Sequence, residues 1–310
     1  MTEPHDHHHD HGAGTHHHAP ADFGTAFAVG IALNLAYVAG ECVYGAIAHS
    51  LALLADAGHN LGDVLSLAGA WLASVLSRRL PSSRYTYGLR RSSILAALGN
   101  AILLLVITGG IAWESVRRLV HPTQVGGAIV MAVAAAGIVI NGATALMFLS
   151  GRKHDINIRA AFVHMASDAL VAFGVVVTGA VILWTGLRWL DPAVSLLISL
   201  VIVFGTWSLL RDSVILSLDA VPAGIDPAEV TRFLARHPGV ASIHDLHIWP
   251  MSTTETALTC HILMPAGHPG DPFLVELARE LQQHFDIGHA TIQVEVDADV
   301  ACALASDRVV

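Results

Sequence analysis

Six apolar stretches constrain the fold of this chain more than any other feature of its sequence. A helix needs about 20 consecutive apolar residues to cross the hydrocarbon core of a bilayer. The stretches run over Phe23–Ile47, Leu51–Leu76, Ser92–Val116, Val125–Leu149, Ala160–Leu183 and Pro192–Leu216. Composition agrees, since 54% of the residues are hydrophobic and only 13% are charged, about half the charged share of a soluble domain. We therefore predict an all-α, six-helix transmembrane domain over residues 22–216.

The basic residues of the short loops predict how this domain sits in the membrane. The loops after the second and fourth stretches hold eight of them, namely Arg78, Arg79, Arg84, Arg90, Arg91, Arg152, Lys153 and Arg159. The loops on the other side hold three, namely Arg117, Arg118 and Arg188. Because Lys and Arg collect on the cytosolic side, the first group is expected to be cytosolic. An even number of spans then places both termini in the cytosol of a protein of the inner membrane.

The sequence after Leu216 has the character of a soluble domain, which we predict over residues 217–300 with a tail at 301–310. Helices are expected at Pro227–Arg236, with Asp226 as N-cap, and at Phe273–Phe285. Strands are expected at Ser242–Trp249, Thr254–Met264 and Ala290–Val296, the last with Ile292, Val294 and Val296 on one face. This order predicts a small two-layer α+β domain.

Charge and cysteine content exclude several classes of protein. From Ser217 onward, thirteen Asp and Glu residues oppose four Arg, so a phosphate-binding basic surface is lacking and nucleic acid is not an expected partner. Three scattered cysteines, Cys42, Cys260 and Cys302, cannot build a disulfide framework and fit a reducing compartment.

The N-terminal segment, residues 1–21, is a histidine-rich tail that we expect to be disordered. Eight of the twenty histidines fall within the first eighteen residues, interleaved with Asp6 and Asp10. An expression tag is one interpretation, but tags are usually uninterrupted runs. The interleaving favours a native metal-collecting tail. The segment lacks the pattern of a secretory signal peptide, so none is expected.

The second and fifth stretches each carry His-x-x-x-Asp, as His59/Asp63 and His164/Asp168. Residues four apart lie on one helix face, so each pair presents an imidazole nitrogen and a carboxylate oxygen to one point. Two facing pairs supply an N₂O₂ set that fits tetrahedral Zn²⁺. The missing thiolates disfavour Cu(I), and two imidazoles disfavour Mg²⁺ and Ca²⁺. The alternative is that each histidine is an interhelical hydrogen-bond partner, but two such motifs in mid-span favour metal.

Other polar residues in the spans give weaker signals. Asp56 lies near the face of Asp63 and is a candidate metal ligand or proton relay. Glu41 and Glu114 lie near the predicted span ends and are expected to reach the membrane interface, with a role in transport as the alternative. Three asparagines are expected to form packing hydrogen bonds: Asn34, Asn100 and Asn141.

Together with the segment His244-Asp245-Leu246-His247-Ile248-Trp249, these features resemble the cation diffusion facilitators, and within them the bacterial zinc/cobalt/cadmium efflux members. The resemblance runs from about Phe23 to Val296. It implies a homodimer that exchanges cytosolic Zn²⁺ for external protons by alternating access. It also implies a ferredoxin-like, metallochaperone-like C-terminal domain that dimerises. Carried over by motif, the transport site is His59, Asp63, His164 and Asp168.

In the C-terminal domain the resemblance implies a regulatory zinc site at His244, His261 and Glu295, with His247 and His289 as nearby candidates. The alternative is that these residues are structural. Two departures stand out. The loop Ser83–Gly88 lacks the histidine site of some relatives, and Ser92 and Ser93 stand where many relatives have an acidic residue, which puts in doubt an ion pair that locks the dimer.

Ligand chemistry predicts the mechanism, because metal needs neutral imidazole and ionised carboxylate, so protons and Zn²⁺ compete for one site. We therefore predict proton-coupled efflux of Zn²⁺, with Co²⁺ and Cd²⁺ as further substrates. A membrane metallohydrolase is disfavoured because the chain contains no His-Glu-x-x-His, so no enzyme activity is expected. A membrane-bound metal sensor that binds zinc without transporting it remains an alternative.

Overall fold

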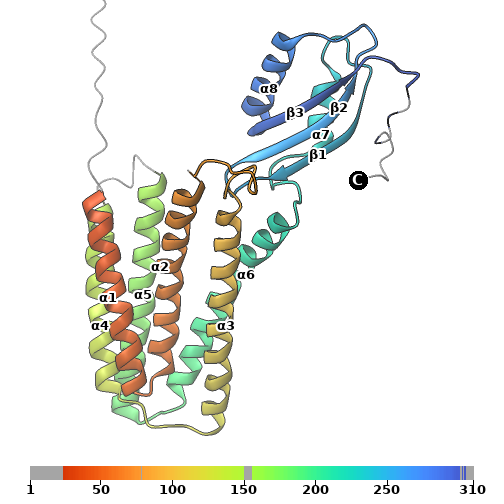
Figure 1. The fold of residues 1–310 in the computed structure, drawn as a ribbon. Coiled ribbons are helices and arrows are strands. Elements are labelled where there is room, and N and C mark those ends of the chain that lie inside the picture. Colours follow the sequence, from red (N-terminus) through yellow and green to blue (C-terminus); the bar gives the residue numbers. More distant parts are fainter. Residues whose placement is uncertain (1–23, 78, 150–155, 301, 303, 305–310) are drawn as a thin grey trace, which may run out of the picture.

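The computed structural model describes residues 24–77, 79–149, 156–300, 302 and 304. The predicted histidine-rich tail and most of the C-terminal tail lie outside this range. Six long helices come first: α1 (Gly24–Ile47), α2 (Leu51–Ser77), α3 (Ser92–Val120), α4 (Gly127–Phe148), α5 (Ile156–Thr185) and α6 (Leu190–Ser217). They form one bundle, in which α4 packs along α5, α3 along α6, and α2 touches α1, α3, α5 and α6 (Figure 1). The predicted all-α membrane domain is thus confirmed, with ends shifted by a few residues.

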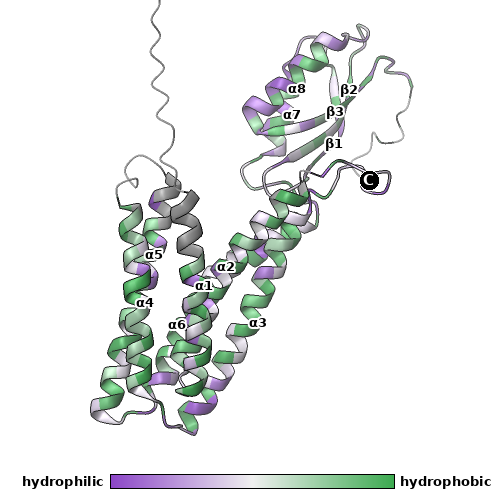
Figure 2. Ribbon diagram, turned by 60° about the vertical axis from the view of Figure 1, so that its left-hand side comes forward, coloured by the Kyte–Doolittle hydropathy of each residue, from purple (hydrophilic) through white to green (hydrophobic). Residues whose placement is uncertain are grey.

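Hydropathy separates these helices into two groups. Within the described residues, α3, α6 and the segments Gly127–Met147 and Phe162–Thr185 are long and apolar enough to cross a membrane. The described apolar part of α1, Ala32–Ile47, is shorter. The polar residues of α2, among them Asp56 and Asp63, lower its hydropathy. Hydrophobic residues dominate the helices of the bundle, whereas the C-terminal domain is mixed (Figure 2). Many large hydrophobic side chains of the bundle are exposed, among them Trp113, Leu170 and Phe204.

A carboxylate from α6 holds the beginning of α2. Asp191, which is fully buried, accepts hydrogen bonds from the Ser50 hydroxyl at 2.5 Å and from the backbone N–H of Leu51 at 2.7 Å. The first N–H groups of a helix have no partner within it. Asp191 supplies that partner from 140 residues away, so it ties the start of α2 to α6.

The C-terminal domain has the predicted order. Its elements are α7 (Pro227–Ala235), β1 (Ser242–Pro250), β2 (Thr256–Leu263), α8 (Asp271–Phe285) and β3 (Ile287–Glu295). The sheet order is β1-β2-β3, with β1 antiparallel and β3 parallel to β2. Asp226 caps α7 as predicted, since its carboxylate accepts from the Ala228 N–H at 2.9 Å.

The two helices of this domain cover one face of its sheet. Buried Val230 and Leu234 of α7, and Leu277 and Leu281 of α8, pack on a set of strand residues, Ile248, Leu258, Cys260 and Ile262. The last strand was predicted at Ala290–Val296, but in the structure it begins earlier, at Ile287, and ends at Glu295. Ile292 and Val294 pack on this core, but Val296 lies beyond the end of β3 and is 47% exposed.

The domain lies at the end of the bundle where α2 ends and α3 begins (Figure 1). Arg90 contacts Glu255 of the β1–β2 turn at 2.6 Å, and Arg91 pairs with Asp219. The Ser93 hydroxyl accepts a hydrogen bond from the Thr253 N–H at 3.1 Å. Ser92 and Ser93 thus lie where the bundle meets the C-terminal domain.

Candidate metal centres

The helices α2 and α5 bring the four residues of the two His-x-x-x-Asp motifs together. Across the helices, His59 Nε2 lies 3.4 Å from Asp168 Oδ1, and His164 Nε2 lies 3.2 Å from Asp63 Oδ2. Within each helix the imidazole and carboxylate atoms lie 3.9 Å apart in α2 and 3.7 Å apart in α5. The two imidazole rings meet edge to face with centroids 6.2 Å apart. The four side chains therefore form one cluster, the membrane cluster.

The spacing of these donor atoms fits a zinc ion. Ligand atoms about 2.0–2.2 Å from a tetrahedral metal lie about 3.3–3.6 Å from one another. The four nitrogen–oxygen separations, 3.2, 3.4, 3.7 and 3.9 Å, lie within a few tenths of an ångström of that range, and the two histidines contact different oxygens of Asp168. His59, Asp63 and Asp168 each offer one donor atom within 4.8 Å of the other two. The helix repeat sets two of these separations and the packing of α2 against α5 sets the other two.

Burial differs among the four side chains. Asp168 is 2% exposed, whereas His59 and Asp63 are about a third exposed at 30% and 28%. Asp168 contacts both histidines. Asp168 is thus the buried member of the cluster, whereas the other three side chains are partly exposed.

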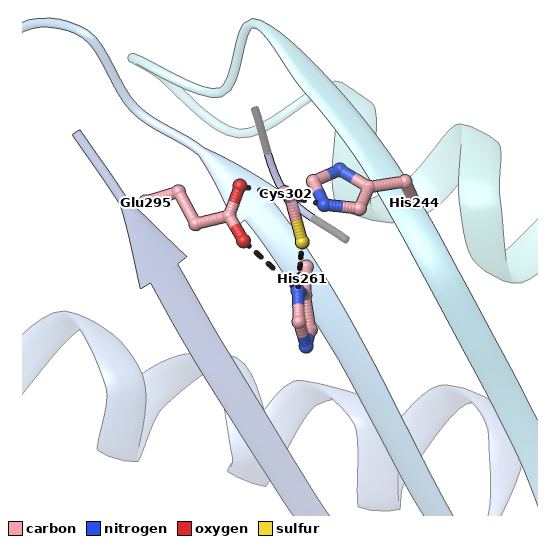
Figure 3. Close-up of side chains that lie close together, drawn as sticks. All are labelled: His244, His261, Glu295 and Cys302. Carbon is pink, nitrogen blue, oxygen red and sulfur yellow. Dashed lines mark hydrogen bonds and ion pairs between the residues drawn. The ribbon is translucent and has the colours of Figure 1, made fainter. Parts of the chain in front are cut away.

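A second cluster lies on the sheet of the C-terminal domain. His244 and His261 are direct cross-strand partners on β1 and β2, and Glu295 ends β3 beside Leu263. His261 Nδ1 lies 2.9 Å from Glu295 Oε1, and His244 Nε2 lies 3.4 Å from Glu295 Oε2. Cys302 places its Sγ 3.5 Å from His261 Nδ1 (Figure 3). These four side chains form the cytosolic cluster.

Strand alternation explains which face carries the cytosolic cluster. Cys260 and Ile262 point into the core beneath the helices, so His261 between them points to the opposite face. Ile292 and Val294 do the same in β3 and leave Glu295 on the face of His261. The predicted trio is thus brought together.

Neighbouring groups tune the cytosolic cluster. Burial acts to raise the pKa of the Glu295 carboxyl, but hydrogen bonds from Cys302 and His261 outweigh it and hold that pKa below its usual range. Glu295 is therefore ionised and ready to act as a ligand at neutral pH. Burial raises the pKa of the Cys260 thiol to about 12, so Cys260 is a core residue and not a ligand.

The irregularity in β1 brings one further carboxylate to the cluster. The register shifts between His244 and His247, and Asp245 within this bulge has a positive φ of 51°. Asp245 Oδ2 lies 3.6 Å from His261 Nε2, and its Oδ1 lies 2.9 Å from His247 Nε2. A carboxylate on the second ring nitrogen orients a ligating histidine.

Several residues have a different place from the one expected. His247 pairs with Asp245, and His289 packs edge to face on Tyr87, so neither joins the cytosolic cluster. Glu41 was expected at the membrane interface, but it is fully buried between α1 and α2, where Asn60 donates to it at 3.1 Å. The reason is that α1 presents its Glu41 face to the polar face of α2. Glu114 does lie near the end of α3, paired with Arg117 and Arg118.

Sequence reasoning did not find Cys302 as a member of the cytosolic cluster, or Asp245 as the carboxylate that contacts its His261. Cys302 lies seven residues beyond Glu295, in a segment predicted only as a tail. A cysteine shortly after a strand that ends in a candidate ligand was the available signal. Asp245 gave none, because its orientation depends on the bulge.

Comparisons with known proteins agree with this architecture. The family model described as the cation efflux transmembrane domain matches residues 27–216, and that of the cation efflux protein cytoplasmic domain matches residues 222–297. Zinc transporter ZitB of Escherichia coli is 38% identical over 294 residues, covering 93% of this chain and 92% of ZitB. The metal cation efflux system protein CzcD of Cupriavidus metallidurans is 36% identical over 286 residues, covering 92% and 90%.

Two further matches extend this set. A cadmium, cobalt and zinc/H(+)-K(+) antiporter of Bacillus subtilis is 32% identical over 267 residues, covering 84% of this chain and 86% of that protein. A solved structure of the metal-bound C-terminal domain of the CzcD transporter is 43% identical over 23% of this chain and 99% of that chain, with a TM-score of 0.22. On the family models and the full-length relatives, the chain belongs to the cation efflux family, the cation diffusion facilitators, which are transporters and not enzymes.

Proposed function

We propose that this protein exports Zn²⁺ and related divalent cations from the cytosol across the inner membrane in exchange for protons. The transport site in this proposal is the membrane cluster of His59, Asp63, His164 and Asp168. The relatives named as zinc transporter, as metal cation efflux protein and as cadmium, cobalt and zinc antiporter support the substrate class.

The single observation that carries the proposal is that two histidines and two aspartates from α2 and α5 contact one another in the membrane cluster. Each of the two imidazole nitrogens lies 3.2–3.9 Å from an oxygen of both carboxylates, and two imidazoles with two carboxylates are a ligand set that suits tetrahedral zinc. Ionisable side chains inside a membrane span are energetically costly, so their presence there indicates a functional site. Zn²⁺, Co²⁺ and Cd²⁺ accept such a mixed set, whereas Cu(I) prefers sulfur and Mg²⁺ prefers oxygen.

Proton exchange follows from the same ligands. Zinc binds neutral imidazole and ionised carboxylate, so each metal ion that enters must displace the protons held there. In alternating access the cluster takes up metal when it faces the cytosol and protons when it faces outside. A more acidic exterior then drives metal outward.

The arrangement of charged loops supports the orientation and the assembly. The C-terminal domain lies at the arginine-rich end of the bundle, where Arg90 and Arg91 contact it, and that end is cytosolic under the positive-inside rule. We further propose a homodimer, joined in part through this acidic domain, which the match to the family's cytoplasmic domain supports.

The cytosolic cluster is proposed to hold regulatory zinc. His244, His261, Glu295 and Cys302 offer one donor atom each, all within 4.8 Å of one another. Binding of cations there would offset the repulsion between two acidic domains in a dimer. Small-angle scattering tests this idea, because an identical dimer shape with and without zinc contradicts it.

Zinc uptake into everted membrane vesicles tests the transport function. The native chain is expected to accumulate zinc in response to an imposed pH gradient, and Asp63→Ala and Asp168→Ala are expected to abolish accumulation. Asp212→Ala, an exposed carboxylate in the same bundle, is the matched control and should transport normally. Undiminished flux in both ligand variants rejects the transport site, and absence of flux in the native chain indicates a metal sensor.

A further inference from the structure

A second buried polar group lies in the bundle, apart from the metal ligands. It consists of Glu41 on α1 and Asp56 on α2, which we call the carboxyl pair, with Asn60 and Tyr37 beside it. Asp56 precedes His59 by three residues, about 4.5 Å along the helix axis. The carboxyl pair therefore lies between the membrane cluster and the end where α2 begins, which is the outer end in the proposed orientation.

The carboxyl pair is closed off from solvent. Glu41 is 0% and Asp56 is 1% exposed, and the neighbouring Asn60 and Tyr37 are 0% and 5% exposed. Gly137 of α4 closes the group from the other side, because a Cβ there would lie 2.1 Å from the Tyr37 hydroxyl oxygen. A carboxylate in such a place needs a counter-charge or a proton.

Counter-charges are missing around the pair. The ion pairs within the described part of the chain include neither Glu41 nor Asp56. The titratable groups that face the pair are Tyr37 and Cys42 of α1, His59 of α2 and Asp168 of α5. Asp168 is itself an acid, and His59 is already engaged by Asp63 and Asp168. The facing part of α4 offers Gly137, which does not titrate.

The unpaired oxygen atoms of the carboxyl pair indicate that the pair needs a proton. Asp56 lies one helical turn before Asn60 on the same face of α2, and Asn60 donates to Glu41, so Asp56 lies on the side of α2 that meets Glu41. Asn60 donates its one contact to Glu41 Oε2, which leaves Glu41 Oε1 and Asp56 Oδ1 buried without a donor. Asn60 Oδ1 is also buried without a donor. One proton held by this pair removes one of two buried like charges that no cation offsets.

We propose that Glu41 and Asp56 hold one exchangeable proton between them and form a proton-binding site of the transporter that is separate from the metal ligands. The pair carries a charge of −1 when loaded and −2 when empty. A dication in the membrane cluster, one to two helical turns away, favours the empty state, so metal binding releases this proton to solvent. That second step rests on the proposed transport function, whereas the shared proton itself does not.

Infrared spectroscopy tests the shared proton without any metal. A protonated carboxylic acid has a carbonyl band distinct from those of a carboxylate. The purified, metal-free protein at neutral pH is expected to show this band, and both Glu41→Gln and Asp56→Asn are expected to lose it. Each replacement keeps the shape of the protonated side chain, which limits loss of folding. A spectrum in which the band is absent from the native protein, or persists in both variants, overturns the proposal.

Proton counting tests the coupling to metal. Zinc is added to the weakly buffered protein and the protons released per zinc bound are measured with a pH indicator. Glu41→Gln is expected to release about one proton fewer than the native protein while still binding zinc at the membrane cluster. Glu114→Gln, an acid at the end of α3 paired with arginines, is the matched control with native release.

The outcomes of the second experiment separate the two proposals. Native release in both Glu41→Gln and Asp56→Asn overturns coupling through the pair. Zinc affinity that depends on K⁺ instead of pH, and loses that dependence in Glu41→Gln, shows an alkali ion at the same oxygens and also overturns it. Failure of the native protein to bind zinc at the membrane cluster overturns the transport site, and the infrared result still decides the proton.

Discussion

The membrane bundle and the C-terminal domain each gather histidine and carboxylate side chains, but they assemble them by different physical means. In the bundle, each helix contributes a complete pair at i and i+4, so only one packing contact, α2 against α5, remains to be made. In the C-terminal domain, four candidate ligands come from three strands and the following segment. That cluster depends on sheet register, on a bulge and on where the chain goes after β3.

This difference predicts that the two clusters bind metal independently of each other. It also predicts that they differ in how well they tolerate the loss of one ligand. Loss of one ligand from the membrane cluster leaves buried charge between apolar helices. The cytosolic cluster lies on the sheet face opposite the core, where water replaces a lost ligand at less cost. The expected effects below run from the largest to the smallest.

Asp168→Asn is expected to give the largest effect. Asp168 is 2% exposed and contacts both histidines, so its replacement removes one ligand and weakens the orientation of two others. Because even partners of ligands contribute about 10–100-fold to metal affinity, zinc affinity at the membrane cluster should fall by more than about 100-fold. Isothermal titration of the full-length protein measures it. A parallel loss at the cytosolic cluster would show that the two sites are not independent.

His261→Ala is expected to lower zinc affinity at the cytosolic cluster by about 100-fold, and Cys302→Ser by about 10-fold. His261 contacts Glu295, Cys302 and Asp245, whereas Cys302 lies at the margin. The same titration measures both, with the exposed His268→Ala as control. Equal losses would indicate that the segment after β3 holds the metal as firmly as the sheet does.

The same contrast between local and long-range contacts explains which features the sequence predicts. The six helices and the order of the C-terminal elements are predictable because apolar length and alternation are local properties. The pairing of His59 with Asp63 is local as well. Burial of Glu41 is not, because it depends on which face of α1 meets α2, so the interface prediction was wrong. The place of Cys302 depends on the path of the chain after β3, for which its position shortly after Glu295 was the one available signal. The place of Asp245 depends on the geometry of the bulge, which no spacing in the sequence encodes.

Asp191→Ala tests the contact that ties α2 to α6. The substitution leaves the Ser50 hydroxyl and two buried N–H groups at the start of α2 without an acceptor. Such a loss costs about 2 kcal/mol, so the free energy of unfolding of the bundle should fall by that amount, measured by denaturant titration of the purified protein with circular dichroism. Asp212→Ala serves as control. An unchanged transition would show that water reaches this helix end.

Asp226→Ala is the local counterpart and is expected to have the smallest effect. Asp226 caps α7 from two residues away, at an exposed position where water can replace the lost acceptor. Replacement of an N-cap by alanine costs about 1 kcal/mol, so the C-terminal domain should lose about half of what the bundle loses with Asp191→Ala. The same denaturant titration measures it, and Asp226→Asn, which retains an acceptor oxygen, should recover most of the loss. Equal losses of stability in the two alanine variants would show that burial of the Asp191 cap adds nothing to its contribution, and that the buried and the exposed cap stabilise their helices equally.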